Sequence, residues 1–144
     1  MESIIDSPFK SISIIYRKSH IWLNEGCAKY GLTAAQAVVI LIICDFKSLT
    51  QDEITKRLGL DKSVIAKTVT KLLETGFIIR STNPKDKRTY DIQPTDKAWE
   101  VYPFVSEQIE ICFQRMTMHM TLEQRNEFKQ LLLMAGEAAI AQEG

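Results

Sequence analysis

Basic and hydroxyl-bearing side chains gather on one face of the segment 61–74, which reads DKSVIAKTVTKLLE. Helical spacing brings together Lys62, Ser63, Lys67, Thr70 and Lys71. Lysine ammonium groups attract phosphates, and hydroxyl groups both donate and accept hydrogen bonds. The pattern indicates non-covalent recognition of an anionic, hydrogen-bonding partner. An ordinary solvated helix face is the alternative.

A second basic cluster lies in the segment 83–88, NPKDKR, with Lys85, Lys87 and Arg88. It separates two strand-like runs, 77–81 and 89–93, so the pattern predicts a β-hairpin with a cationic tip. Narrow A·T-rich minor grooves attract inserted arginine, and Arg88 is the candidate for this contact. Alternatively, Arg88 is a surface charge paired with Asp86, and both descriptions can hold together.

The residues around these clusters predict the elements that position them. A short helix with Ile54 and Leu58 ends at Gly59, and Asp61 is suited to cap the next helix. Apolar residues recur on the other face of that second helix: Ile65, Val69, Leu72 and Leu73. Helix, tight turn, helix and hairpin form a winged helix-turn-helix pattern, whose second helix suits a major groove.

Side chains typical of catalysis or metal binding are sparse. His20 and His119 accompany no Ser-His-Asp, HExxH or CxxC spacing, so we expect no enzyme activity, no metal and no cofactor. A metal site would need His20, Cys27 or Cys44, whose spacings match no ligand pattern. Cys27 near tyrosines is also a candidate peroxide-sensing thiol, although a buried packing cysteine is the more usual role.

The chain has 144 residues, the size of one ordinary domain, and its 45% hydrophobic content can fill a core. Its formal net charge is +0, from 18 basic and 18 acidic residues. Nine of the basic and five of the acidic residues lie in 51–90, which gives this segment a net charge of +4 and the remainder −4. Such polarity suits a protein that presents one cationic face to phosphates.

Targeting features are missing from the sequence. Residues 1–10 lack the basic start and apolar run of a signal peptide, and the most apolar segment, 37–44, is too short to cross a bilayer. Three widely spaced cysteines, Cys27, Cys44 and Cys112, are typical of reduced thiols. We therefore expect a soluble, cytoplasmic protein without a membrane partner.

Long helices are expected on both sides of the winged segment. The first begins near Ser7-Pro8, with these apolar positions: Phe9, Ile12, Ile15, Tyr16, Trp22, Leu23 and Cys27. The second, Thr33 to Phe46, is apolar on nearly every side and should be central. A strand is the alternative there, but Thr33 and Gln36 form a capping box that favours a helix.

Two more helices should follow the hairpin. One runs from Thr95 to Met118 with Pro103 near its first turns, and the other starts at Thr121. The last helix should turn these residues inward: Leu122, Phe128, Leu131, Leu132 and Ala135. Because the first and last helices carry more apolar surface than a winged module can cover, the pattern predicts a two-fold dimer.

The segment 49–88 resembles the winged helix-turn-helix of the multiple-antibiotic-resistance regulator (MarR) family. Leu60-Asp61-Lys62-Ser63 opens the recognition helix, and Pro84-x-Asp86-x-Arg88 forms the wing. The upstream GLTAAQ at 31–36 is also similar to the family pattern. Departures are Ala66 and Lys67 in the recognition helix, Thr70 where an acidic residue is common, and a proline-containing exit from the wing at 94–98. We therefore expect altered base readout and an altered wing exit.

This resemblance implies a mainly α fold with an α+β wing. A single domain, 1–144, would comprise a DNA-binding lobe at 33–93 and dimerisation helices at 1–30 and 95–144. It implies a homodimeric, sequence-specific transcriptional regulator on double-stranded DNA with a pseudo-palindromic operator, acting as a ligand-responsive repressor. The implied DNA-binding residues are Lys62, Ser63, Lys67, Thr70, Lys71, Lys85, Lys87 and Arg88.

Two other site assignments follow from the resemblance. Asp86 is expected to orient the wing arginine. Tyr16, His20 and Trp22 are expected either to line a cleft for a small aromatic or lipophilic ligand or simply to pack in the core. A different functional class is also open, namely a winged-helix module for protein–protein contacts whose basic stripe is incidental.

Overall fold

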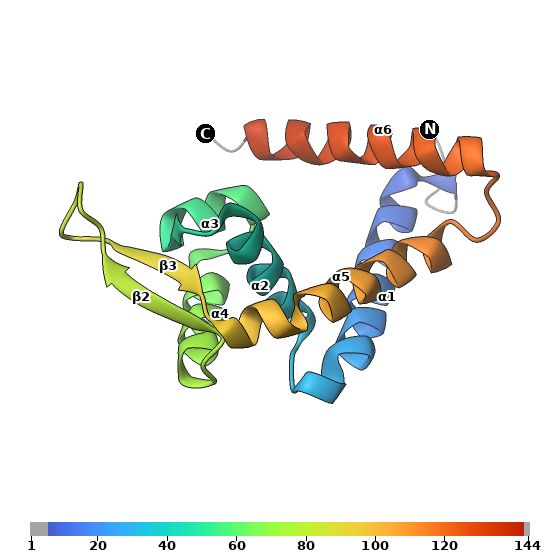
Figure 1. The fold of residues 1–144 in the computed structure, drawn as a ribbon. Helices are drawn as coiled ribbons and strands as arrows, with labels where there is room; N and C mark the ends of the chain where they lie inside the picture. The colour runs from blue at the N-terminus through green and yellow to red at the C-terminus, as the bar shows by residue number, and fades with distance from the viewer. Residues whose placement is uncertain (1–5, 143–144) are drawn as a thin grey trace.

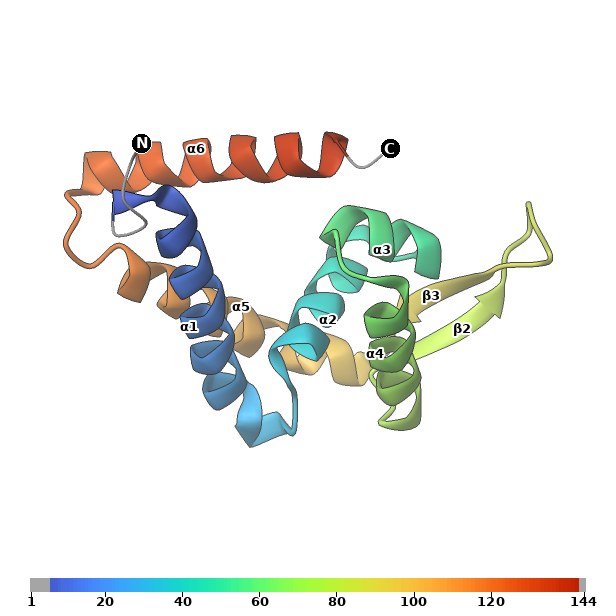
Figure 2. The same cartoon turned by 180° about the vertical axis from the view of Figure 1, so that it is seen from behind.

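Six α-helices, one short 3-10 helix and a three-stranded sheet make up residues 6–142, the part of the chain that the computed structural model describes (Figures 1 and 2). In chain order they are α1 (Pro8–Cys27), η2 (Ala28–Tyr30), α2 (Ala34–Phe46), β1 (Leu49–Thr50), α3 (Gln51–Leu58), α4 (Lys62–Glu74), β2 (Ile78–Thr82), β3 (Tyr90–Pro94), α5 (Asp96–Met116) and α6 (Leu122–Ala141). The expected mainly α fold with a β wing is confirmed.

Side-chain caps fix where the helices begin. Ser7 caps α1, its hydroxyl accepting from the Phe9 amide at 3.2 Å, and Pro8 is the first helical residue. Thr33 with Gln36 forms the capping box of α2, as predicted, and Thr121 with Gln124 forms that of α6. These bonds satisfy amides that a helix start would otherwise leave without a partner, which is why the boundaries were readable from sequence.

Helix α2 is the centre of the core. Ala37, Val39, Ile40 and Ile43 on it are completely buried, and the helix packs against α1, α4, α5 and β3. Its β-branched run is therefore helical, because burial on all sides and the capping box outweigh the residues' preference for strands.

The sheet is antiparallel with strand order β1-β3-β2. Strand β1 has only two residues and was not predicted; it pairs Leu49 with Ile92. Strands β2 and β3 each begin one residue later than expected. The reason at β2 is that the Phe77 amide bonds to the Leu72 carbonyl and so closes the end of α4. Pro94, which has no amide hydrogen, is the last residue of β3.

Helices α1 and α5 pack against each other, and Gly26 of α1 faces Gln108 of α5. A Cβ atom at Gly26 would lie 2.3 Å from Oε1 of Gln108, so the end of that flexible side chain would have to turn aside. Helix α5 ends at Met116 rather than at Met118, because Thr117 is buried and caps the end through a 2.8 Å bond from its hydroxyl to the Phe113 carbonyl.

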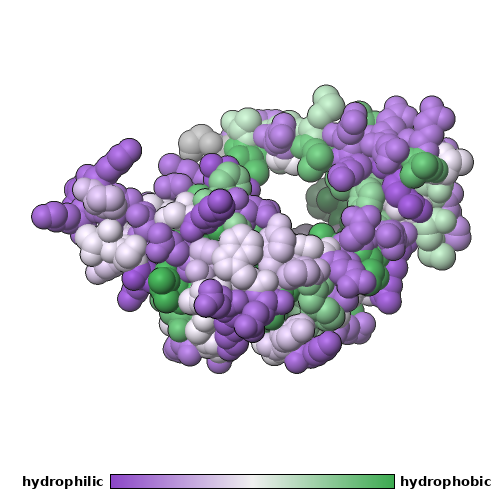
Figure 3. All heavy atoms as spheres, viewed as in Figure 1, coloured by the Kyte–Doolittle hydropathy of each residue, from purple (hydrophilic) through white to green (hydrophobic). Residues whose placement is uncertain are grey.

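The inward packing predicted for α6 is wrong for the single chain. None of the residues Leu122–Ala141 is buried, and Leu122, Leu131 and Leu132 are 71%, 54% and 44% exposed. Figure 3 shows hydrophobic side chains bordering an open gap beneath this helix. Its contacts with the rest include the stacked rings of Phe113 and Phe128, 6.3 Å apart. One chain supplies no second layer against which α6 can bury its leucines.

Among residues 6–142, no helix by itself has the length and apolar character needed to cross a membrane; α1 with η2 and α2 meets that criterion only as a pair bent by 75°.

Candidate nucleic-acid interface

Helix α4 separates its apolar and basic residues onto opposite faces. Ile65, Val69 and Leu72 are at most 2% exposed. The polar side chains on the other face are all exposed: Lys62, Ser63, Lys67, Thr70 and Lys71. The buried face fixes the helix on the core, so the basic face is presented to solvent as a rigid unit.

The turn before α4 sets its direction. Gly59 adopts φ +64°, a left-handed conformation that ends α3, and its amide bonds to the Thr55 carbonyl at 3.0 Å. Asp61 occupies the cap position, and its carbonyl accepts from Ile65 at 3.1 Å. Its carboxylate makes no capping hydrogen bond, so only the backbone part of the expected cap is present.

A shallow hollow of about 340 Å³ runs along the exposed face of α4. It is lined by Ala66, Lys67, Thr70, Lys71 and Glu74. Ala66 contributes only a small side chain to this hollow, and a base edge or a thymine methyl group would fit against such a surface. Lys67 and Lys71 carry positive charges of the kind that attract phosphates.

Sequence reasoning overlooked Thr68, which lies on the buried face of the same helix. It is 7% exposed, and its hydroxyl donates to the Val64 carbonyl at 2.8 Å. The spacing of three from Ile65 and four to Leu72 was the signal that placed it inside. Two threonines two residues apart thus face opposite environments on α4.

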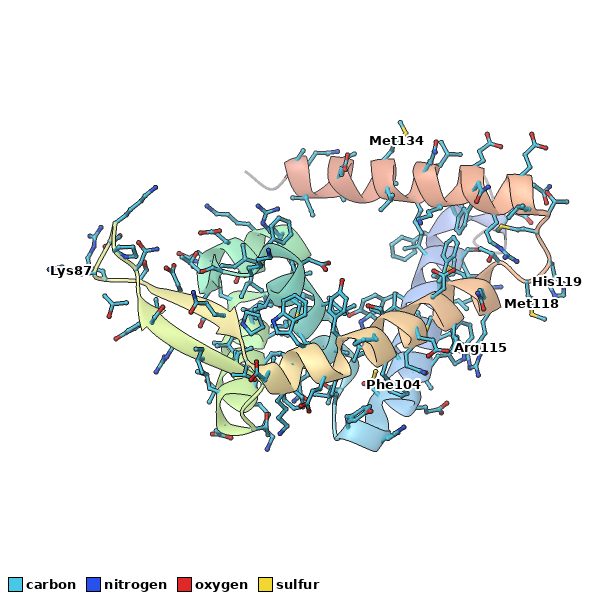
Figure 4. The ribbon with its side chains drawn as sticks, viewed as in Figure 1. Lys87, Phe104, Arg115, Met118, His119 and Met134 are labelled. Atoms are coloured by element: carbon cyan, nitrogen blue, oxygen red, sulfur yellow. The ribbon has the colours of Figure 1, made fainter. Side chains whose placement is uncertain are left out.

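The wing tip is closed by its own hydrogen bonds. The Asn83 side-chain oxygen accepts from the amides of Lys85 and Asp86 at 2.8 and 3.1 Å, and its amide group donates to Asp91 at 2.8 Å. The backbone amide of Asn83 also donates a hydrogen bond to the Thr89 carbonyl at 3.1 Å. Lys85, Lys87 and Arg88 are exposed on this loop, and Figure 4 shows Lys87 at its far end.

Asp86 and Arg88 form a two-bond pair on the wing. Nε of Arg88 donates to Oδ1 of Asp86 at 3.0 Å, and its Nη2 donates to Oδ2 at 3.2 Å. The Arg88 amide also donates to Oδ1 at 3.0 Å. These bonds, those from the Arg88 side chain above all, hold the pKa of the Asp86 carboxyl below its usual value. The arginine side chain itself remains 90% exposed.

Arg80 is a basic residue at the base of the wing that sequence reasoning did not select. Its guanidinium lies 4.9 Å from the centre of the Tyr90 ring. With Arg88 it contributes to a pocket of about 190 Å³ beside the start of α3. The sequence could have predicted this contact, because Arg80 and Tyr90 lie on the two strands of one hairpin as diagonal neighbours, whose side chains can reach each other.

Of the three aromatic residues considered for ligand binding, the structure brings two together. Tyr16 and His20 line an open cavity of about 480 Å³ between α1, α2 and the turn from α3 to α4. Their rings are 4.2 Å apart, and Nδ1 of His20 is 2.8 Å from the Tyr16 carbonyl. Both are exposed, so neither is a core residue of this chain. Trp22 lines a separate hollow, where Arg115 lies 5.6 Å from its ring.

The three cysteines are buried and free. Burial raises the pKa of Cys27 and Cys112, and burial with the nearby Asp45 charge raises that of Cys44 to about 11. A raised pKa keeps each thiol protonated at neutral pH, whereas a reactive cysteine has a lowered pKa. The environment of Cys27 is therefore that of a packing residue.

Known proteins with similar sequences and folds have the same helix-turn-helix and wing. The model of the MarR family matches residues 30–89. Among curated proteins, the chain is similar to the HTH-type transcriptional repressor MdtR of Bacillus subtilis (strain 168), with 29% identity over 87 residues, which covers 60% of this chain and 56% of MdtR. The chain spans about half the length of the curated relatives it matches.

Solved structures match over nearly the whole chain. A crystal structure of MarR is 28% identical, has a TM-score of 0.86, and the match covers 100% of this chain and 99% of that one. A mutant MarR from E. coli, complexed with operator DNA, shares the fold at 22% identity with a TM-score of 0.80, covering 93% and 99% of the two chains. The winged lobe, the flanking helices and their order are thus those of the solved MarR structures, and residues 30–89 of the chain match the model of the MarR family.

Proposed function

We propose that this protein is a DNA-binding transcriptional regulator that acts as a homodimer, represses from a pseudo-palindromic operator and responds to a small ligand. The observation that carries the proposal is the rigid basic face of α4 together with the arginine held on the wing. A buried scaffold beneath an exposed, donor-rich helix face is the arrangement that major-groove reading requires. MdtR, a repressor by name, is similar to this chain over 87 residues.

The contacts divide by role. Ser63 and Thr70 on α4 carry hydroxyls that suit base edges, while Lys62, Lys67 and Lys71 suit phosphates. Arg88, oriented by Asp86, would extend into the flanking minor groove, with Lys85 and Lys87 on the adjacent backbone. Arg80 lines the same pocket as Arg88 and would bind a phosphate between the start of α3 and the wing.

The dimer is supported by the apolar surface that one chain leaves uncovered. Phe9 and Ile12 on α1 are 71% and 63% exposed, and Leu131 and Leu132 on α6 are 54% and 44% exposed. The N-terminal end of α1 lies beneath α6 in both views (Figures 1 and 2). A second copy related by a two-fold axis would bury both helices, and its two recognition helices would then fit half-sites about 10 bp apart.

The cavity that holds Tyr16 and His20 supports ligand control. Its wall includes Leu60 and Asp61, the residues that aim α4, and Val64 on α4 itself. A small aromatic or lipophilic molecule bound there would contact α1 and the recognition helix at once. If it bound more tightly to a spacing of the two lobes that does not fit DNA, it would release the operator by shifting populations.

The experiment is selection of bound sequences from random duplex DNA, followed by fluorescence anisotropy on the selected site. Affinity should fall by orders of magnitude between roughly 50 and 200 mM salt, because phosphate contacts release counterions. Lys67→Ala should reduce both the affinity and the slope of this dependence, whereas Lys18→Ala on α1 should change neither. Failure to enrich a two-fold symmetric sequence, or binding that ignores salt, would favour a protein–protein module instead.

A further inference from the structure

The turn between α5 and α6 concentrates sulfur and imidazole side chains. Met116, Met118, His119 and Met120 lie within five consecutive residues, RMTMHMT in context, and include three of the five methionines of the chain. They belong neither to the basic face of α4, nor to the wing, nor to the cavity beside α1. Their chemistry is therefore open to a separate role.

The backbone of this turn is fixed at both ends. Thr117 is completely buried, and its amide and hydroxyl bond to the Phe113 carbonyl at 3.1 and 2.8 Å. The Met120 amide bonds to the Thr117 carbonyl at 3.0 Å, which makes 117–120 a four-residue turn. The capping box of α6 follows immediately. The side chains of the turn are thus displayed from a hydrogen-bonded frame rather than from a free loop.

Met118 and His119 occupy the two corner positions of this turn. Met118 is 67% exposed and His119 is exposed, while Met116 and Met120 are half-buried beside them. Figure 4 shows Met118 and His119 projecting from the same turn, away from the helices. A turn brings the Cα atoms of its first and last residues to within about 7 Å, so a thioether and an imidazole at its corners and the thioethers of Met116 and Met120 on its flanks start from one short stretch of backbone.

The surrounding charges matter for the kind of ion that would fit. Residues 116–120 contain no carboxylate, so the available ligands are all neutral. The basic residue next to the turn, Arg115, has its guanidinium 5.6 Å from the Trp22 ring. Among residues 6–142, no group of three or more His, Cys, Asp or Glu side chains could hold a metal ion, so no competing site of that composition is found there. Neutral thioether and imidazole ligands are soft or borderline, and such ligands select Cu(I) over hard divalent cations.

We propose that the turn between α5 and α6 is a binding site for Cu(I), with the thioethers of Met116, Met118 and Met120 and the imidazole of His119 as ligands. The site involves coordination only, with no change in oxidation state, and Ag(I) has the same soft character. Because the turn is the hinge from which α6 departs, a bound ion would restrain the angle between α5 and α6.

The experiment uses the full-length protein labelled with carbon-13 at its methionine methyl groups and titrated with one equivalent of Ag(I). The methyl signals of Met116, Met118 and Met120 should shift together, because sulfur coordination acts on the adjacent methyl group. Met134, exposed on α6, should keep its position and serves as the internal control. Ag(I) captured by the buried thiols would leave the three turn signals unshifted, and that result would overturn the proposal.

Variants then assign the ligands. Cu(I) affinity is measured by competition with a coloured Cu(I) chelator. Met118→Leu and His119→Gln should each weaken binding about tenfold, equivalent to about 1.4 kcal/mol, and Met134→Leu should leave it unchanged. Leucine keeps the volume of methionine, so the fold is retained. Equal affinity of wild type and the double variant Met118→Leu/His119→Gln would also overturn the proposal, whatever its effect on DNA binding.

Discussion

Asp86 binds Arg88 through both carboxylate oxygens, at 3.0 and 3.2 Å, while leaving the arginine side chain 90% exposed. The two bonds fix the plane of the guanidinium before any partner arrives. An exposed ion pair of this kind contributes little to stability. Its effect is therefore on binding, because an oriented side chain loses less conformational freedom when it enters a groove.

Asp86→Asn tests this orientation. Asparagine keeps the shape of the side chain but offers one acceptor oxygen and no charge, so Arg88 loses its two-bond partner. Affinity for the selected DNA should fall about three- to tenfold, up to about 1.4 kcal/mol, while the Tm of the protein stays the same. Anisotropy and thermal unfolding check these two outcomes. Glu123→Gln on α6 is the matched control, and equal DNA affinity of Asp86→Asn and wild type would contradict the role given to Asp86.

Thr68 and Thr70 provide an internal comparison on one helix. Thr70→Val removes a hydroxyl from the exposed face, so DNA affinity should fall by the value of about one hydrogen bond, roughly 1 kcal/mol. Stability should change by less than about 0.5 kcal/mol. Thr68→Val removes a buried hydroxyl that bonds only to its own helix, so DNA affinity should be unchanged and unfolding should shift by at most about 1 kcal/mol.

The two variants are measured side by side by anisotropy and by urea unfolding. A loss of DNA affinity in Thr68→Val that equals the loss in Thr70→Val would show that the helix had moved. Exposure on one face of α4 would then not identify the residues that contact DNA.

Local features of the fold were predictable from sequence because their causes are local. The capping box at Thr33 and Gln36, the left-handed Gly59 and the Asn-Pro turn of the wing each depend on residues within a few positions. The separation of faces on α4 was predictable for the same reason, since one period decides which side chains are buried.

Features that depend on distant segments were not predictable in this way. Strand β1 exists because Leu49 meets Ile92, which is 43 positions away. Trp22 follows Tyr16 by six residues on α1, yet it lies in a different hollow because α5 brings Arg115 over it. Helix α6 leaves its leucines exposed because no other segment of this chain covers them. Each case needs the packing partner, which spacing along one helix does not identify.

Cys44 should make stability depend on alkaline pH. Burial and the Asp45 charge raise the folded-state pKa of its thiol from its ordinary value of 9.0 to about 11. The folded state then holds its proton more tightly than the unfolded state. The stabilisation is fully present below the unfolded pKa near 9 and is lost as pH rises through about 11. Urea unfolding at a series of pH values in this range should show the decline.

Comparing Cys44→Ala with wild type separates the effect of this thiol on stability from that of the other groups that titrate at high pH. The variant should be less stable at neutral pH because it leaves a small cavity, yet its stability should decline less steeply between pH 9 and 11. At neutral pH, Cys44 in the folded wild type should also react slowly with thiol reagents. Parallel pH curves for the two proteins would contradict the raised pKa.

The leucines of α6 are the place where the proposed dimer is most directly tested. Leu131 and Leu132 are 54% and 44% exposed, so Leu131→Glu/Leu132→Glu adds charge without disturbing the core of the single chain. In a dimer the same positions would be buried, and an unpaired buried charge is strongly unfavourable. Sedimentation equilibrium should therefore find wild type as a dimer and this variant as a single chain, with the circular dichroism of both nearly equal.

DNA binding should respond in step with assembly. Two recognition helices on one rigid body gain from the high effective concentration of the second contact, so a single chain should bind the symmetric site at least about a hundredfold more weakly. Gln130→Glu adds one charge at an exposed neighbouring position and is the control for charge alone. If the double variant remained a dimer, α6 would not be the interface. If it became a single chain with unchanged DNA affinity, the symmetric reading of the operator would fail, although the basic face of α4 would still be the contact surface.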